Sequence, residues 1–485
     1  MNLSLFCVHS TRLAVAIASG AALPIALLVP SLARSVTAQT PPEPQPDAVQ
    51  VPDFLNPNPN PLLVPTRPEE VKIQRTQPIT LAEALELAKR NNRDLQVSIL
   101  ELERSRSALR ESQAVMLPNV DVLTGLTNRG DGFTGNASQS STSFNGEARI
   151  NYDLFTSGNR RAIIRAAEEQ LRIDELDVEN RSLEIQLNVT TQYYDLQEAD
   201  EQVRINRSAV ENSQASLRDA EARERAGVGT RFDVLQSQVN LANAQQSLTR
   251  SLSNQRIARR QFATLLNLAQ SAEISAADAV QVAGLWQQTL EESIIQAFQN
   301  RPELQQVLAE RNISEQQRRQ ALSRLGPQIS LNGSYNVFDR FDDGVSLTDG
   351  YSVGLRASLA LFDGGAARAR AAQSKVSIAI NESRFASERE RIRFDVEQFY
   401  SQLQSNLENI QTSGVGLNQA REALRLARLR FEAGVGTQTD VIFAENELTR
   451  AEGNRVTAIL NYNRALANLQ RTVTFRSAGA SDRQN

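Results

Sequence analysis

Cysteine and histidine are almost absent from this chain of 485 residues. The one cysteine, Cys7, and the one histidine, His9, both lie within residues 1–38, which we interpret below as a signal peptide. The remaining chain would then offer no Cys or His metal ligand, no nucleophile activated by histidine and no disulfide. We therefore expect no catalytic residue, no metal site and no cofactor, and we predict that the protein is not an enzyme.

Proline is scarce outside one segment, and aromatic residues are scarce throughout the chain. Ten of the 16 prolines fall within residues 41–68, and aromatics make up only 5% of the chain. Beyond that segment stand Pro78, Pro118, Pro302 and Pro327. The later chain is rich in Ala, Leu, Gln, Glu and Arg, a composition typical of very long helices. Residues 39–78 are predicted to be an extended proline-rich linker, because each proline removes a backbone donor.

An excess of charge of one sign is also lacking. The 52 basic and 56 acidic side chains are interleaved and leave a formal charge of -4. A nucleic-acid partner would require a basic surface. We therefore expect no nucleic-acid binding.

The first 38 residues have the pattern of an export signal. Arg12 precedes an apolar run over residues 13–29, and small residues Val36 and Ala38 stand at the −3 and −1 positions of a cleavage site after Ala38. A retained transmembrane anchor is the alternative interpretation. Pro24 and the small-residue ending favour cleavage.

The rest of the chain is a duplication. Residues 154–158, Leu-Phe-Thr-Ser-Gly, recur as Leu-Phe-Asp-Gly-Gly at 361–365, and Ala-Gly-Val-Gly-Thr at 226–230 recurs at 433–437. Both pairs are 207 positions apart, which indicates two structural repeats. We place the first repeat at residues 79–270 and the second at 288–475. An inter-repeat linker at 271–287 and a tail at 476–485 complete the chain.

Each repeat contains two strands with alternating apolar and polar residues. In the first repeat they lie within residues 119–155, and in the second within 328–362; residues 143–154 alternate without a break. Strands of about ten residues with this alternation are typical of transmembrane β-barrels. Half of a soluble sandwich is the alternative, but four strands among so many helical residues have no second sheet to cover them.

Two helices are too long for a globular domain. Residues 158–226 and 365–433 would each span roughly 100 Å at the rise of an α-helix. Apolar residues recur seven apart in both, which is the spacing of a coiled coil. These are Leu196, Val203, Val210 and Leu217, then Leu403, Ile410, Leu417 and Leu424. Returning helices are predicted at 231–268 and 438–473, capped by Thr230 and Thr437.

Four strands cannot close a barrel, and an open sheet edge is not tolerated in lipid. The chain must therefore oligomerise, and three copies would give about twelve strands, wide enough for an aqueous lumen. The predicted fold is mainly α with a transmembrane β-barrel part. It is a duplicated helix–hairpin–helix repeat with four strands per protomer, and its trimer forms a 12-stranded barrel and a long α-helical coiled-coil tunnel.

With these features, residues 79–475 resemble the TolC-like outer-membrane efflux protein family. The resemblance rests on the two Gly-Val-Gly-Thr turns, each followed by Asp-Val, and on the Leu-Phe-x-x-Gly exits from strand to helix. It implies a homotrimer in the outer membrane of a Gram-negative-type cell, with the helical part in the periplasm. Its contacts would be outer-membrane lipid, a periplasmic adaptor protein and an inner-membrane transporter. The implied function is an exit duct for efflux of small molecules, for type I protein secretion, or for both.

The resemblance also assigns candidate site residues. The tip turns that would dock the adaptor are Gly227, Val228, Gly229 and Thr230, with Gly434, Val435, Gly436 and Thr437. Asp440, and Asp233 in the other repeat, are candidates for the aperture. The family has a second acidic position three residues after Asp440, where this chain has Phe443.

Plainer interpretations remain open at this point. The glycine turns could be simple connectors, and Asp233 or Asp440 in a first helical turn is favoured by the helix dipole alone. A periplasmic coiled-coil adaptor protein is the alternative function, although adaptors carry one hairpin beside β-rich domains. A hydrolase with paired carboxylates is the third candidate, but no loop-rich segment gathers such a pair.

Overall fold

The computed structural model describes residues 55–57, 60, 62–73, 75–130, 140–341 and 344–473. All of them belong to one unit, residues 49–485. The predicted signal peptide at 1–38 and the tail at 476–485 lie outside the described residues. Within the described ranges, no helix combines the length and apolar character needed to cross a membrane.

Both repeats have the same order of elements, which confirms the predicted helix–hairpin–helix duplication. The first contains α2 (Leu81–Asn91), α3 (Arg93–Ala114), β2 (Asn119–Gly130), β3 (Ser140–Phe155), α4 (Asn159–Arg225) and α5 (Arg231–Leu265). The second contains α6 (Leu290–Asn300), α7 (Pro302–Ser323), β5 (Gln328–Arg340), β6 (Thr348–Ser358), α8 (Ala366–Glu432) and α9 (Gln438–Val473). Three short elements stand outside this pattern: α1 (Pro68–Val71), β1 (Arg75–Ile79) and β4 (Ala272–Ala276).

Local sequence explains where the helices begin. Thr80 and Glu83 form a capping box at the start of α2, and Thr289 with Glu292 does the same for α6. The two long helices start differently. Gly158 and Gly365 adopt left-handed φ angles of 89° and 87° immediately before α4 and α8, which lets each chain turn sharply from sheet to helix.

The four long strands form one antiparallel sheet in the order β2-β3-β5-β6. The register aligns most apolar residues of the four strands on one face, while Leu123 and Phe338 fall on the other. In this alignment Val122 is opposite Ala148, Ala148 is opposite Tyr335, and Tyr335 is opposite Tyr351. Much of this apolar face is exposed in the single chain. The opposite face carries mainly polar residues, so one side of the sheet is suited to contact with lipid and the other to contact with water.

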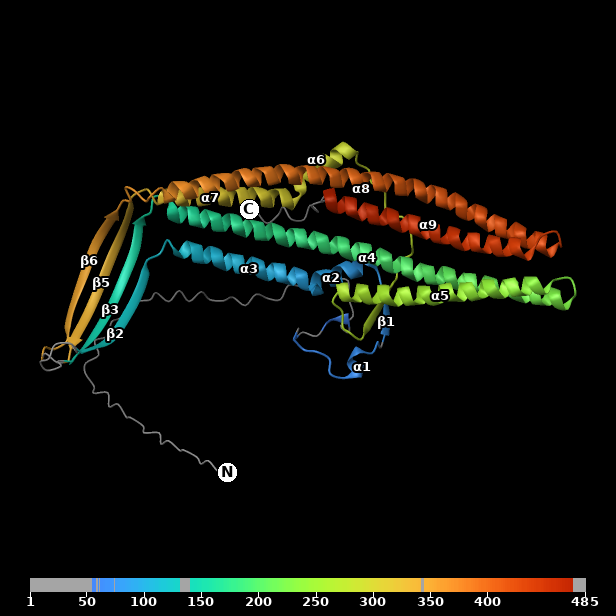
Figure 1. Ribbon diagram of the computed structural model, residues 1–485, viewed down its shortest axis with the longest axis horizontal. Coiled ribbons are helices and arrows are strands. Elements are labelled where there is room, and N and C mark those ends of the chain that lie inside the picture. Colours follow the sequence, from blue (N-terminus) through green and yellow to red (C-terminus); the bar gives the residue numbers. More distant parts are fainter. Residues whose placement is uncertain are drawn as a thin grey trace, which may run out of the picture. The chain divides into compact units, whose positions relative to one another are not determined.

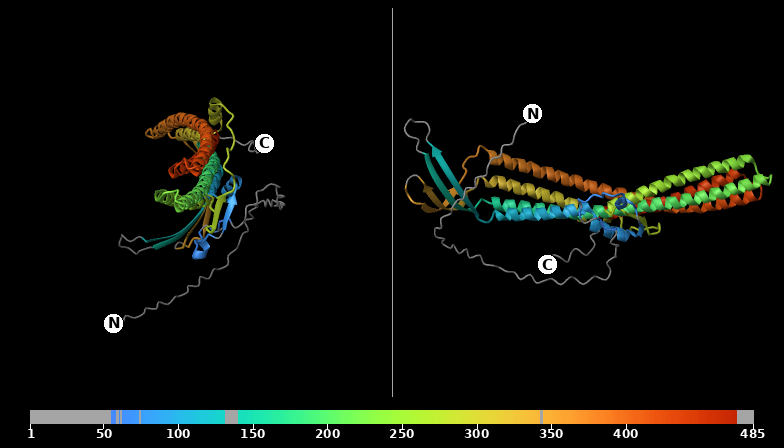
Figure 2. Two further views of the ribbon diagram at one scale, coloured as in Figure 1. Left: turned by 90° about the vertical axis from the view of Figure 1, so that its right-hand side faces the viewer. Right: turned by 90° about the horizontal axis from the view of Figure 1, so that it is seen from below.

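The helices α4 and α8 each contain 67 residues, or roughly 100 Å. The sheet lies at one end of them and the turns to α5 and α9 at the other (Figure 1). The helix α4 packs against α3, α5, α7 and α9, and α8 packs against α6, α7 and α9; Figure 2 shows the columns side by side. Of the eight predicted seam residues, six are buried and two, Leu217 and Leu417, are partly buried.

Two segments predicted as linkers contain paired strands instead. The strand β1 falls at the end of the proline-rich segment, β4 falls in the inter-repeat segment, and the two pair in parallel, Arg75 with Ala272 through Ile79 with Ala276. Pro78 is accommodated within this two-stranded pairing, because an edge position needs no donor on its outer side. Neither strand was predicted from the sequence.

A cluster around Tyr193 holds the small sheet against α4. The Tyr193 ring is buried and lies edge-on to Phe262 of α5, with ring centroids 5.8 Å apart. Its hydroxyl donates to the Asp278 carboxylate at 2.7 Å, and the Ile79 carbonyl oxygen lies 3.0 Å from the same hydroxyl. Tyr193 is thus a packing residue of the core.

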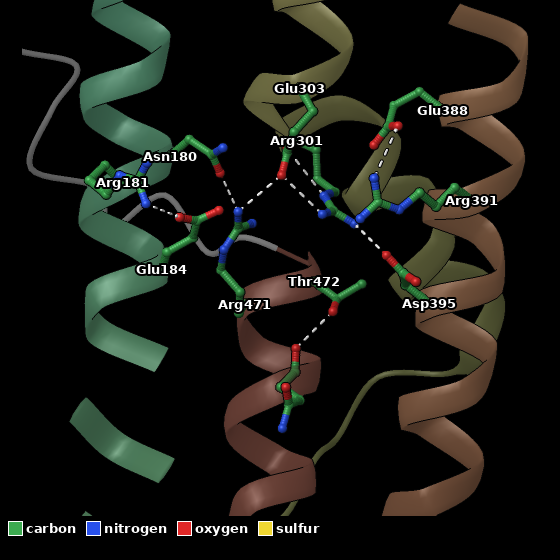
Figure 3. A network of polar contacts seen from close by, with 11 residues as sticks. Asn180, Arg181, Glu184, Arg301, Glu303, Glu388, Arg391, Asp395, Arg471 and Thr472 are labelled. Carbon is green, nitrogen blue, oxygen red and sulfur yellow. Dashed lines mark hydrogen bonds and ion pairs between the residues drawn. The ribbon is translucent and has the colours of Figure 1, made fainter. Parts of the chain in front are cut away.

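A buried ionic network ties four helices together at the level where α9 ends and α7 begins (Figure 3). Arg301 contacts Glu303 at 3.0 Å and Asp395 of α8 at 3.2 Å. Arg471 of α9 contacts the same Glu303 oxygen at 3.0 Å and also binds Asn180 of α4. Burial alone would raise the pKa of Glu303, but the hydrogen bond and charge of Arg301 and the charge of Arg471 lower it to about 2.

We predict that this network makes the fold sensitive to acid. The pKa of Glu303 is lowered on folding. The stabilisation of the fold by the ionised Glu303 carboxylate is therefore complete above the ordinary pKa of 4.5 and is lost as the pH falls towards about 2. Glu303→Gln should cost on the order of 3 kcal/mol at pH 7. It should also flatten the loss of stability between pH 4.5 and 2.

Thermal unfolding of the two proteins across this pH range is the measurement. The matched control is Glu310→Gln on the same helix, where the carboxylate makes only an exposed contact with Arg384 at 3.8 Å. Equal pH profiles for the Glu303 and Glu310 variants would contradict the prediction.

Candidate functional site at the two helix-hairpin tips

The turn residues predicted as a site lie at the two tips, between α4 and α5 and between α8 and α9. Gly227 and Gly434 have φ angles of 75° and 76°. In the first tip, the amides of Val228 and Gly229 both donate to the Arg223 carbonyl, at 3.0 and 3.1 Å. In the second tip, the amides of Val435 and Gly436 both donate to the Arg430 carbonyl. These bonds satisfy carbonyls that the end of each long helix leaves unpaired.

The second glycine of each turn is required by space. A Cβ on Gly229 would lie 2.9 Å from the Arg223 Cβ, and a Cβ on Gly436 would lie 3.0 Å from the Phe431 amide nitrogen. A side chain at either position would therefore push the turn away from its helix. The valines between the glycines, Val228 and Val435, point outward and are largely exposed.

The two candidate aperture aspartates cap the returning helices. The Asp233 amide donates to the Thr230 hydroxyl at 3.2 Å, and the Thr230 amide donates back to the Asp233 carboxylate at 3.1 Å. Thr437 and Asp440 form the same reciprocal pair at 3.1 and 2.9 Å. The backbone and side-chain hydrogen bonds from Thr437, together with the charge of Arg430, lower the pKa of Asp440. The structure therefore gives both aspartates a local role at a helix start.

Hydrogen bonds bring the two tips of one chain together. Gln438 at the start of α9 donates to Ser237 of α5 at 3.0 Å. Further up, the buried Glu445 carboxylate accepts from Ser216 of α4 at 2.7 Å and from Arg428 of α8 at 3.1 Å. We call this contact between the two hairpins the inner seam. It is polar along much of its length.

The inner seam ends in a ring contact near the turns. The Arg223 guanidinium lies over the Phe431 ring at 4.1 Å and donates to the Phe431 carbonyl at 2.9 Å. These contacts join α4 of the first repeat to α8 of the second.

Two exposed phenylalanines stand beside the predicted turns. Phe443 was noted in the sequence as a departure from an acidic position, whereas Phe232 was not singled out. Both are about two-thirds exposed, at 67% and 69%. Their signal in the sequence is an aromatic side chain within the first two turns of a helix, in a chain with few aromatic residues. Over the described ranges, no group of three or more His, Cys, Asp or Glu residues could hold a metal ion.

Comparison with known proteins decides the family. The sequence model described as "Outer membrane efflux protein" matches residues 84–268 and 293–473, one match in each repeat. The chain belongs to the outer membrane efflux protein family. Family and fold are thus those of outer-membrane channels rather than enzymes or periplasmic adaptors. The predicted location is confirmed as the outer membrane, with the helical part on the periplasmic side.

Individual relatives agree with this assignment. The pyoverdine export outer membrane protein OpmQ of Pseudomonas aeruginosa is 24% identical over 421 residues, which cover 82% of this chain and 85% of OpmQ. The solved structure of CusC matches with a TM-score of 0.73 at 16% identity, covering 88% of this chain and 98% of CusC. The outer membrane protein VceC of Vibrio cholerae matches with a TM-score of 0.69 at 17% identity, covering 81% and 95%. These structural likenesses confirm the predicted fold.

We predict that the threonine caps stabilise the tips locally. Thr230→Ala and Thr437→Ala should each cost about 1 kcal/mol, or roughly fivefold faster amide hydrogen exchange in the first turn of α5 or α9. Each hairpin should respond separately. Thr449→Ala is the control, since this threonine lies inside α9 and only donates to the Glu445 carbonyl. Equal effects of Thr449→Ala and Thr437→Ala on the first turn of α9 would count against the capping role.

Proposed function

We propose that three copies of this chain form a closed twelve-stranded barrel continued by a hollow helical tunnel. The observation that carries the proposal is the four-stranded sheet with one continuous apolar face. Among the described strands, β2 and β6 each pair on one side only. Unpaired edges cannot remain in lipid. Pairing β6 of one copy with β2 of the next would remove every edge and turn the apolar face to the hydrocarbon.

The proposed activity is passive transport through this duct. The protein would serve as the exit of a tripartite assembly, with a periplasmic adaptor protein at the tips and an inner-membrane transporter as the source of energy. The two turns over residues 227–230 and 434–437 are the proposed docking sites, supported by the exposed Val228 and Val435. Small molecules are the preferred class of cargo, because the name of the relative OpmQ states export of pyoverdine. Type I protein secretion rests on family resemblance alone.

The orientation of the sheet can be tested with two neighbouring residues of β6. Val353 lies on the apolar face and Ser352 on the polar face, where its hydroxyl is 2.9 Å from that of Ser334. We expect Val353→Arg to make the free energy of folding into lipid vesicles less favourable by about 2–4 kcal/mol, the cost of an arginine on the lipid face near the bilayer centre. Ser352→Arg should fold normally, because its side chain would enter the water-filled lumen. Refolding yield on unheated gels measures both, and equal loss would contradict the orientation.

Stoichiometry and conductance test the proposal as a whole. Purified protein should have the mass of three copies in detergent and should conduct ions across planar bilayers. A monomer without conductance would overturn it.

Crosslinking from Val228 and Val435 in intact cells, followed by mass spectrometry, should identify an adaptor. Capture of no adaptor at either position would contradict the docking assignment.

We also propose that the carboxylates of Asp440 and Asp233 line the aperture, supported by the lowered pKa that keeps Asp440 ionised. We expect Asp440→Ala to reduce cation selectivity and to change conductance. Thr437→Ala is the matched control, since it removes the same cap but keeps the carboxylate. If both variants conduct alike, Asp440 only starts a helix.

A further inference from the structure

The duplication places each inner-seam position at two sites in the chain. On α9, the residues Gln438, Thr439, Glu445 and Asn446 contact the first hairpin, and we call them face A. Their partners, Ser216, Gln236, Ser237 and Asn240 on α4 and α5, form face B. Subtracting 207 from face A gives Arg231, Phe232, Gln238 and Val239, which we call face A′. Adding 207 to face B gives Ala423, Phe443, Ala444 and Glu447, which we call face B′.

Two of the four face A residues are covered, and the equivalents of these two on face A′ are open. Gln438 and Glu445 are only 1% and 5% exposed, whereas their equivalents Arg231 and Gln238 are exposed. The neighbouring position shows the same contrast with apolar residues: Ile442 is 8% exposed, and its equivalent Leu235 is 48% exposed. The uncovered surface of α5 also includes Phe232 at 69% and Val239 at 61%. Equivalent helices thus differ chiefly in that one has a neighbouring hairpin and the other does not.

We propose that face A′ of one copy packs against face B′ of a second copy, so that Phe232 meets Phe443 across the interface. This inference rests on the proposed trimer and names its contact at the tips. Within the chain, Thr439 donates to Gln236 at 3.1 Å. The same two positions between copies are occupied by Phe232 and Phe443. The contact is head-to-tail, since each copy offers A′ on one side and B′ on the other, and such contacts form a ring when the rotation from one copy to the next closes.

Three further pairs obtained by the same shift are chemically compatible, whereas Val239 falls opposite Glu447 and Arg231 opposite Ala444. Arg223 contacts Phe431 within the chain. The equivalent positions between copies, 207 residues away, are Arg430 and Glu224, which have opposite charges. The contact of Arg428 with Asn212 becomes Glu221 with Gln419, and that of Glu445 with Ser216 becomes Gln238 with Ala423. These transferred pairs do not bring like charges together. The interface between copies therefore has an apolar centre at the two phenylalanines and an ion pair near the turns.

Paired cysteines test this contact directly in the full-length protein. Phe232→Cys and Phe443→Cys are combined in one chain, with Cys7→Ser removing the one natural thiol. Copper phenanthroline serves as the oxidant that joins two thiols to a disulfide. Since every copy carries both cysteines, we expect covalent dimers and trimers to replace the monomer band on non-reducing denaturing gels. Each single variant should remain mostly monomeric.

The inner seam supplies a matched control. Gln236→Cys with Thr439→Cys occupies the equivalent positions within one chain, so its disulfide should change monomer mobility without forming trimers. A protein that is trimeric and conducts ions but does not crosslink through positions 232 and 443 would overturn the inference and leave the proposed function intact. A protein that is monomeric would overturn both. Crosslinking of position 232 to a different protein in cells would show that the surface belongs to an adaptor instead.

Discussion

Backbone groups along the sheet edges are the constraint on which the rest of the molecule depends. In hydrocarbon, each unpaired amide or carbonyl costs several kcal/mol, and in the single chain β2 and β6 each leave one such edge. A sheet of four strands is too narrow to close on itself. The outer-membrane location therefore requires neighbours that supply the missing edge partners. The long helices follow from the same closure, because each strand leads into a helical column that must take its place in the same ring.

In the proposed trimer, the duplication determines which interfaces the ring contains. One chain already holds the contact of its first hairpin with its second, built from Gln438, Ser237 and Glu445 with their partners. A closed ring needs a related contact between copies at every second position. The two repeats have diverged at these positions, for example Thr439 against Phe232, so the two kinds of contact have different chemistry. Sequence divergence between repeats is thus readable as a difference between interfaces.

Much of the fold could be predicted from the sequence because its signals are local. Strict alternation predicted β3, β5 and β6, the absence of proline predicted α4 and α8, and Thr-x-x-Asp predicted both tip caps. Strand order and the β1–β4 pairing depend on contacts between distant segments, and five-residue strands in proline-rich or linker-like sequence give no periodic signal. Phe232 was missed for a related reason. An exposed phenylalanine is ordinary by itself, and it becomes informative only because the equivalent residue of α9, Thr439, contacts Gln236 of the first hairpin.

The difference in chemistry between the inner seam and the proposed contact between copies has a physical reason. The two hairpins of one chain are held near each other by covalent connection, so hydrogen bonds from Ser216, Gln236 and Ser237 need only fix their register. Separate copies must first overcome the loss of translational and rotational freedom, which directional bonds exchanged with water do little to offset. Burial of apolar surface offsets that loss without demanding exact alignment. A polar seam within the chain and an aromatic contact between chains is therefore the distribution expected when one set of positions is used twice, once in folding and once in assembly.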